Sequence, residues 1–160
     1  MLESVTMLWS MTMTTTFDFN DGNGPVPVHK HPNGGGWVAD TAEVDKTVYV
    51  GRRAMVYGNA KVYDNAMVYG SAIVYDNAEV YGKAEVYDNA MVYDNAWVYG
   101  NARIYDNARV YDNTKVYDNT LVFGDTCHQP SDRAEKSDTN EDIFIEMNGK
   151  RYRLVEVEKS

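Results

Sequence analysis

The chain has 160 residues and a formal net charge of −9, with 24 Asp and Glu against 15 Lys and Arg. This length fits one domain with terminal segments, and the acidic balance argues against nucleic acid or anionic membrane as a partner, because both attract basic surfaces. The sequence has a single cysteine, which excludes an intramolecular disulfide, and no run of 18 apolar residues that would predict a transmembrane helix.

Residues 1–16 predict a disordered N-terminus. They lack a basic start, contain Glu3, and carry only a short apolar run from Met7 to Trp9, so they do not resemble a secretory signal peptide. We therefore expect the chain to be made in the cytoplasm without a signal peptide.

Residues 17–37 predict a capping segment, because they are too rich in Gly and Pro for a helix and precede a repeat array whose first edge needs cover. Phe17, Phe19 and Trp37 are the candidate plugs for that open end. His29 and His31 form a His-x-His pair whose imidazoles would point the same way on a strand. Three chains around an axis would then offer six nitrogens to iron or zinc. The alternative is a cap loop with ordinary hydrogen-bonded histidines.

Residues 38–127 contain a repeat of six residues, present fifteen times. One position of each unit is aliphatic, and the position four residues later is small or β-branched. The aliphatic set is Val38, Val44, Val50, Val56, Val62, Val68, Val74, Val80, Val86, Val92, Val98, Ile104, Val110, Val116 and Val122. The second set is Ala42, Val48, Ala54, Ala60, Ala66, Ala72, Ala78, Ala84, Ala90, Ala96, Ala102, Ala108, Thr114, Thr120 and Thr126.

The repeating unit Ala-x-Val-Tyr-Asp/Gly-Asn predicts a short strand followed by a corner. Ala and Val point inward, whereas x and Tyr point outward, because side chains alternate along a strand. Asp/Gly-Asn makes the corner, since Gly and Asn tolerate left-handed backbone angles. A six-residue period does not keep one face of a 3.6-residue helix buried, so the pattern predicts an all-β fold.

This pattern resembles the hexapeptide repeat of left-handed parallel β-helices. The resemblance implies three repeats per triangular coil, and hence about five coils for fifteen repeats. The resemblance also implies a homotrimer, which is frequent in this family. The members of the family include acyltransferases and a zinc carbonic anhydrase. The whole chain further resembles uncharacterised hexapeptide-repeat proteins of bacteriophages and bacteria, and trimeric phage fibres carry His-x-His iron sites similar to the one considered above.

If residues 18 apart stack, the outward positions form three faces. Face one has Trp37, Met55, Ile73, Met91 and Arg109, beside Ala39, Tyr57, Tyr75, Tyr93 and Tyr111. Face two has Lys61, Glu79, Trp97 and Lys115, beside Tyr63, Tyr81, Tyr99 and Tyr117. Face three has Met67, Glu85, Arg103 and Leu121, beside Tyr69, Tyr87, Tyr105 and Phe123.

Face one is the apolar face, and an exposed apolar strip of this size indicates an interface. We expect it to join the subunits of a homotrimer, and the alternative is cover by a terminal segment of the same chain. The predicted interface residues are Trp37, Met55, Tyr57, Ile73, Tyr75, Met91 and Tyr93.

The corners stack in the same way. Asp76, Asp94 and Asp112 fall in one column, where the repulsion between carboxylates would be relieved by a bound calcium ion. The alternative is a column of solvated aspartates that accept hydrogen bonds from corner N–H groups.

The C-terminal part predicts a linker over residues 128–142 and a β-hairpin over residues 143–157. Asn148-Gly149 is a strong signal for a two-residue type I′ turn, which pairs Ile145 with Tyr152 and Ile143 with Leu154. A lone hairpin is marginally stable in water, so it needs the rod, a neighbouring subunit or a protein partner to dock on.

Together these features predict a non-catalytic structural or assembly protein, such as a virion-associated or scaffold-like trimer. No catalytic residue and no cofactor other than the metals named above is expected, because there is no His between Val38 and Cys127 and no insertion interrupts the repeat. The alternatives are an acyltransferase-like or carbonic-anhydrase-like enzyme, which the resemblance suggests, and a carbohydrate-binding module that uses the Tyr ladders.

Overall fold

A computed structural model describes residues 14–125, 127–128, 143–147 and 150–154. These residues form strands and turns without a helix, so none of them could form a membrane-spanning helix. The first strands are β1 (Thr16–Phe17), β2 (Val26–Lys30), β3 (Trp37–Ala39), β4 (Glu43–Val44), β5 (Tyr49–Val50), β6 (Met55–Val56), β7 (Lys61–Val62), β8 (Met67–Val68), β9 (Ile73–Val74) and β10 (Glu79–Val80). The rest are β11 (Glu85–Val86), β12 (Met91–Val92), β13 (Trp97–Val98), β14 (Arg103–Ile104), β15 (Arg109–Val110), β16 (Lys115–Val116), β17 (Leu121–Val122), β18 (Cys127–His128), β19 (Ile143–Met147) and β20 (Lys150–Leu154).

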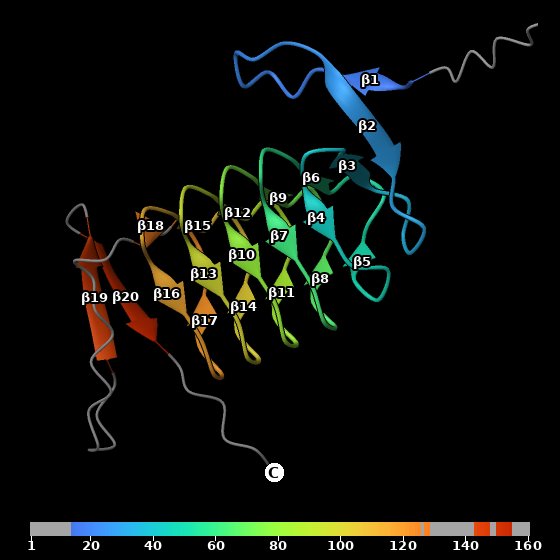
Figure 1. Ribbon diagram of the computed structural model, residues 1–160. Helices are drawn as coiled ribbons and strands as arrows, with labels where there is room; N and C mark the ends of the chain where they lie inside the picture. The colour runs from blue at the N-terminus through green and yellow to red at the C-terminus, as the bar shows by residue number, and fades with distance from the viewer. Residues whose placement is uncertain (1–13, 126, 129–142, 148–149, 155–160) are drawn as a thin grey trace, which may run out of the picture.

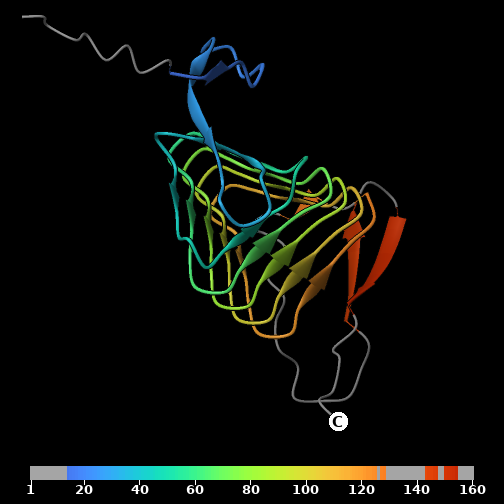
Figure 2. The ribbon, with the colours of Figure 1, turned by 90° about the vertical axis from the view of Figure 1, so that its right-hand side faces the viewer.

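Strands β3 to β18 wind into a parallel β-solenoid of about five coils, as the sequence predicts (Figure 1). Successive strands fall in turn on three sheets, which enclose a triangular cross-section in the view along the rod (Figure 2). The register is constant from coil to coil, so that Met55 pairs with Ile73 and Ile73 with Met91. The three predicted faces are therefore the outer surfaces of the three sheets.

The core consists of the two inward columns of the repeat. From Val48 to Val110 every residue of these columns is completely buried, whether Val, Ala or Ile. Val fills the middle of each short strand and Ala lies next to the corner, where the walls converge. The interior is a continuous stack of aliphatic side chains from one coil to the next, so each coil buries its apolar surface only against its neighbours.

The corners depend on one residue in the left-handed region. From Gly58 to Gly124 the first corner residue of each unit has a φ between 56° and 79°, with the smallest value at Asp76. At most corners the second corner residue donates its N–H to the next coil, as Asn77 does to the Asp94 carbonyl at 2.8 Å. The N–H of the first corner residue can bond to an Asp side chain of the preceding coil. At one such corner the Gly82 N–H donates to Asp64 Oδ2 at 3.1 Å. Asp thus offsets the strain of its backbone with a hydrogen bond to the next coil.

The N-terminal end of the rod is closed by the loop between β2 and β3. β2 pairs antiparallel with β3, and this loop covers β5, because the Gly36 N–H donates to the Val50 carbonyl and the Val50 N–H to the Asn33 carbonyl, both at 2.9 Å. The prediction that Phe17, Phe19 and Trp37 plug this end is wrong. They pack outside the rod on face one, because the outward alternation of β3 places Trp37 on that side.

The C-terminal strands β19 and β20 form an antiparallel hairpin of their own. Its register is the predicted one, with Ile143 opposite Leu154 and Ile145 opposite Tyr152. The predicted turn at Asn148-Gly149, the linker apart from β18, and residues 1–13 lie outside the described residues.

Candidate functional site

The N-terminal segment lies across the first coils of face one. Residues 14–30, called the strap below, comprise β1, β2 and the loop that joins them (Figure 1). Phe19 stacks on Tyr57 with ring centroids 4.3 Å apart, and Phe17 stacks on Trp37 at 5.7 Å. Val28 is buried beside them, at 4% exposure. The strap and face one therefore share a small apolar cluster outside the main core.

This cluster takes up most of the predicted interface. Five of the seven residues of the predicted interface belong to the cluster, and the other two, Met91 and Tyr93, lie beyond it. The five are Trp37, Met55, Tyr57, Ile73 and Tyr75. The alternative, cover by a terminal segment of the same chain, therefore holds for the first coils of face one. The part from Met91 onward extends past the cluster, and a homotrimer interface there stays a prediction.

The tyrosines form a ladder along each face. On face two the rings of Tyr63, Tyr81 and Tyr99 repeat at 4.8 and 5.0 Å with planes within 5° of parallel. Faces one and three carry similar stacks, and Phe123 ends the ladder of face three. Each interior ring is covered on both sides by its neighbours, so the ladders offer ring edges rather than faces. A sugar platform needs open ring faces, which only the ends of a ladder supply.

Charged residues beside the ladders pair between coils. Tyr69 donates its hydroxyl to Glu85 Oε2 at 2.9 Å, and Arg103 reaches the same oxygen at 3.4 Å. Burial, followed by this hydrogen bond and the charge of Glu85, raises the pKa of Tyr69. On face two, Lys115 lies 4.5 Å from the ring centroid of Trp97. The outward positions are thus largely used for contacts from one coil to the next.

The predicted calcium column lies at the corner after face one. Asp94 Oδ2 accepts the Asp112 N–H at 3.2 Å. Burial raises the pKa of Asp76; the hydrogen bond from the Asp94 backbone opposes this, and the charges of Asp94 and Asp21 add to it. Within the described residues no three His, Cys, Asp or Glu side chains converge as metal ligands. Asp76 and Asp94 thus accept corner N–H groups, as the alternative expects, and calcium binding here stays a prediction.

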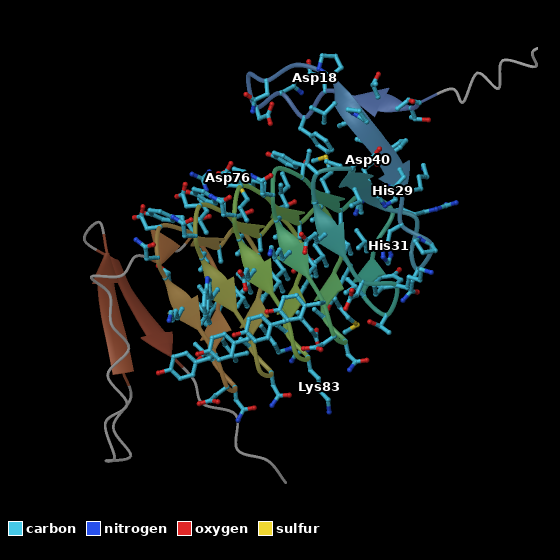
Figure 3. All side chains as sticks on the ribbon, in the orientation of Figure 1. Asp18, His29, His31, Asp40, Asp76 and Lys83 are labelled. Atoms are coloured by element: carbon cyan, nitrogen blue, oxygen red, sulfur yellow. The ribbon has the colours of Figure 1, made fainter. Side chains whose placement is uncertain are left out.

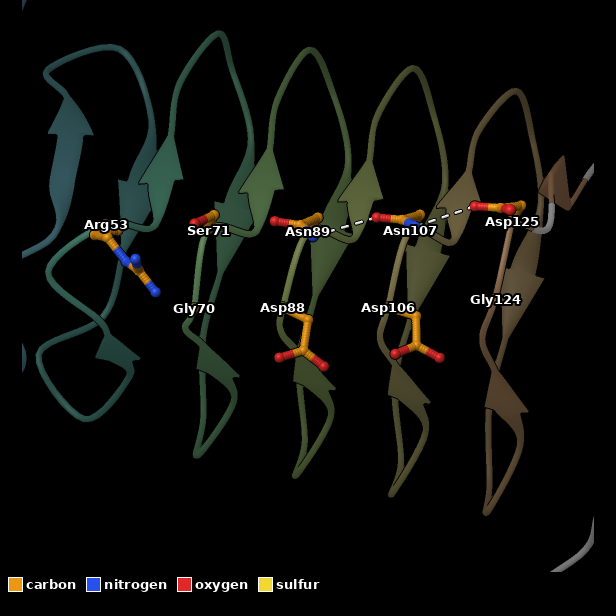
Figure 4. Close-up of a pocket in the computed structure, with 9 residues that line it drawn as sticks. All are labelled: Arg53, Gly70, Ser71, Asp88, Asn89, Asp106, Asn107, Gly124 and Asp125. Atoms are coloured by element: carbon orange, nitrogen blue, oxygen red, sulfur yellow. Dashed lines mark hydrogen bonds between the residues drawn. The ribbon is translucent and has the colours of Figure 1, made fainter.

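A groove of about 640 Å³ follows the corner after face three (Figure 4). One wall is a ladder in which Asn89 donates to Asn107 at 3.2 Å and Asn107 donates to Asp125 at 3.0 Å. The predicted site residues do not include this groove, although the regular spacing of its members along the sequence would have placed them together. Its lining residues are Arg53, Gly70, Ser71, Asp88, Asn89, Asp106, Asn107, Gly124 and Asp125.

The two predicted metal-binding histidines have different surroundings (Figure 3). His31 is 2% exposed, and its Nε2 lies 3.1 Å from the Asp45 carbonyl, to which it donates. Its Nδ1 lies 3.3 Å from the Asn33 nitrogen and 3.2 Å from the Asn33 carbonyl oxygen. His29 is about half exposed and meets Asp40 Oδ1 through Nδ1 at 2.8 Å. Both ring nitrogens of His31 thus contact backbone groups, whereas the Nδ1 of His29 contacts a carboxylate. A metal bound by His29 and His31 stays a prediction.

The comparisons with known proteins agree with this architecture. A family model described as the YdcK beta solenoid repeat matches residues 60–76, 84–100 and 102–118. Each matched stretch begins at an inward alanine of the repeat. The chain is a repeat β-solenoid protein. No curated protein and no solved structure matches it significantly, so the resemblance to bacteriophage hexapeptide-repeat proteins stays a prediction.

Proposed function

We propose that this β-solenoid is a non-catalytic structural element that assembles into a homotrimer through face one. The observation that supports the proposal is that the outward side chains contact one another between successive coils. Tyrosine stacks run along all three faces, Asn ladders follow the corners, and ion pairs join coils on faces two and three. Such contacts stiffen a rod, which is the property that a spacer or scaffold requires.

The apolar character of face one supports the choice of interface. Beyond the cluster with the strap, β12 places Met91 half-buried in line with Ile73. A second copy offers rungs with the same coil spacing, so the apolar rungs of two chains meet in register as far as Met91, after which Arg109 ends the apolar strip. Cyclic symmetry would close three such contacts around one axis. A place in a virion or another large assembly rests on sequence resemblance alone.

The test is the solution mass of the full chain and of Met91→Glu by light scattering. The new carboxylate would face Arg109, its partner on β15, so the coil tolerates it while the apolar contact between subunits is lost. We expect a trimer for the wild type and a monomer for Met91→Glu.

Leu121→Glu is the matched control, because it makes the same kind of change on face three, where Arg103 is the paired residue. This variant is expected to remain trimeric. A wild type that is monomeric at every concentration, or a Met91→Glu variant that stays trimeric, would contradict assembly through face one.

A further inference from the structure

The strap is attached to the rod unevenly. At its C-terminal end, β2 forms a ladder with β3, and the Asp40 N–H donates to the Pro27 carbonyl at 2.9 Å. In residues 14–25 the hydrogen bonds that the structure describes stay inside the strap: the Asn20 N–H donates to Asp18, and the Asn23 N–H to Asp21. The outer part of the strap is therefore held on face one by apolar side chains.

These apolar contacts continue the ladder of face one. The planes of Phe19 and Tyr57 are 14° apart, as are those of Tyr57 and Tyr75. Phe19 thus occupies the position that a further aromatic rung would take, and Phe17 covers Trp37 in the same manner. The strap therefore covers the open ring face at the first rung of this ladder.

The strap also brings a charge that opposes its closure. Burial is the main cause that raises the pKa of Tyr57 to about 12, and the charges of Asp21 and Asp76 add to it. Burial is also the main cause that raises the pKa of Asp76, and the charge of Asp21 is the smallest, so the two carboxylates repel each other weakly when the strap is closed. Attraction between rings and repulsion between carboxylates act against each other at this contact.

We propose that the strap is an autoinhibitory cover, which must lift from Trp37, Met55 and Tyr57 before the full length of face one can bind a second copy of the chain. This inference rests on the proposed function. The outer part of the strap, residues 14–25, can lift while β2 stays paired with β3, and the cap is kept because the loop containing His31 and Asn33 remains bonded to β5 and to the Asp45 carbonyl.

A second copy is the occupant that this surface fits best. The uncovered strip would present residues on β3, β6 and β9 at the spacing of the coils, and another rod of the same kind has that spacing over its whole length. Because only molecules with an open strap can bind, the apparent affinity between subunits equals the intrinsic affinity multiplied by the fraction of open molecules.

Oxidation of methionine reports whether the strap is open. Met55 lies in the cluster under the strap, whereas Met67 lies on face three and serves as an internal reference. In Phe17→Ser/Phe19→Ser we expect Met55 to oxidise faster relative to Met67 when treated with peroxide and analysed by mass spectrometry. We also expect the subunit dissociation constant, measured by light scattering over a concentration series, to fall about tenfold or more.

Asp21→Asn tests the opposite direction and covers the case in which the double variant fails to fold. The Asn oxygen still accepts the Asn23 N–H, whereas the bond from the Asn23 side-chain amide to Asp21 Oδ2 at 3.2 Å is lost within the strap. Because the charge that repels Asp76 is removed, the strap should close more tightly. Met55 should become more protected and the dissociation constant should rise. Asp18→Asn is the matched control, because it removes a charge from the same loop and keeps the bond to the Asn20 N–H.

A strap that opens, with Met55 exposed, while the dissociation constant stays unchanged would overturn the autoinhibitory cover. Wild type and double variant that both remain monomeric would overturn it too, and would point to a foreign occupant of face one. If opening the strap promotes assembly and adding Met91→Glu does not reverse it, the cover holds and the trimer contact proposed at Met91 fails.

Discussion

Val80→Ala tests whether the rod owes its stability to the continuous aliphatic stack. Val80 is completely buried and is paired with Val62 on one side and Val98 on the other. The substitution removes the equivalent of two methylene groups, worth about 1.6 kcal/mol of transfer free energy. The cavity between two rigid coils adds about 1 kcal/mol. We expect the free energy of unfolding to fall by roughly 2.5 kcal/mol.

The position within the rod supplies the control. Val122 is also buried, at 3% exposure, but β17 has a single neighbour, β14, in the part of the chain that the structure describes. The cavity in Val122→Ala has fewer rigid walls, so the free energy of unfolding should fall by only about 1.5 kcal/mol. Urea unfolding followed by far-ultraviolet circular dichroism measures both variants. Equal losses, or a loss below about 1 kcal/mol for Val80→Ala, would refute the argument.

Three further predictions concern the cap, the corners and the ladders. His31→Phe should destabilise the rod by about 2 to 4 kcal/mol in urea unfolding, because the Asp45 carbonyl and the Asn33 N–H lose their partner in a buried site; a loss below about 1 kcal/mol would mean that water replaces the ring. Gly58→Ala should cost about 2 kcal/mol or more, since its φ is 68° and a Cβ would lie 2.7 Å from the Asp76 nitrogen; a variant as stable as the wild type would contradict the tight corner. In an alkaline titration of tyrosinate absorbance, Tyr57 and Tyr63 should ionise late, because burial is the main cause that raises the pKa of each to about 12. Their folded-state pKa lies above the usual value of 10, so the stability they contribute is fully present below pH 10 and is lost as the pH rises through 12. Tyr57→Phe should remove part of this late step, and a loss of absorbance near pH 10 instead would show that Tyr57 ionises freely.

The sequence by itself determined the strands and corners, whereas the coil of three repeats was implied by the resemblance to left-handed parallel β-helices. Val and Ala at a strict period of six can be buried together only if every unit is a strand and a corner, and Asp/Gly-Asn supplies the left-handed residue that each corner needs. The register followed as well, because a shift by one residue would turn Val74 outward and Tyr75 inward. The hairpin register followed from the Asn148-Gly149 signal in the same local way.

The tertiary structure alone decided what covers face one and what closes the end of the rod. Phe17 and Phe19 were recognised as residues that need burial, but the sequence could not tell the end of the core from the outer surface of the first coils. His31 was recognised as part of a cap loop, yet its role depends on the Asp45 carbonyl, which lies in the first coil. Repeats fix structure through local spacing, whereas the strap and the cap depend on contacts between segments that share no period.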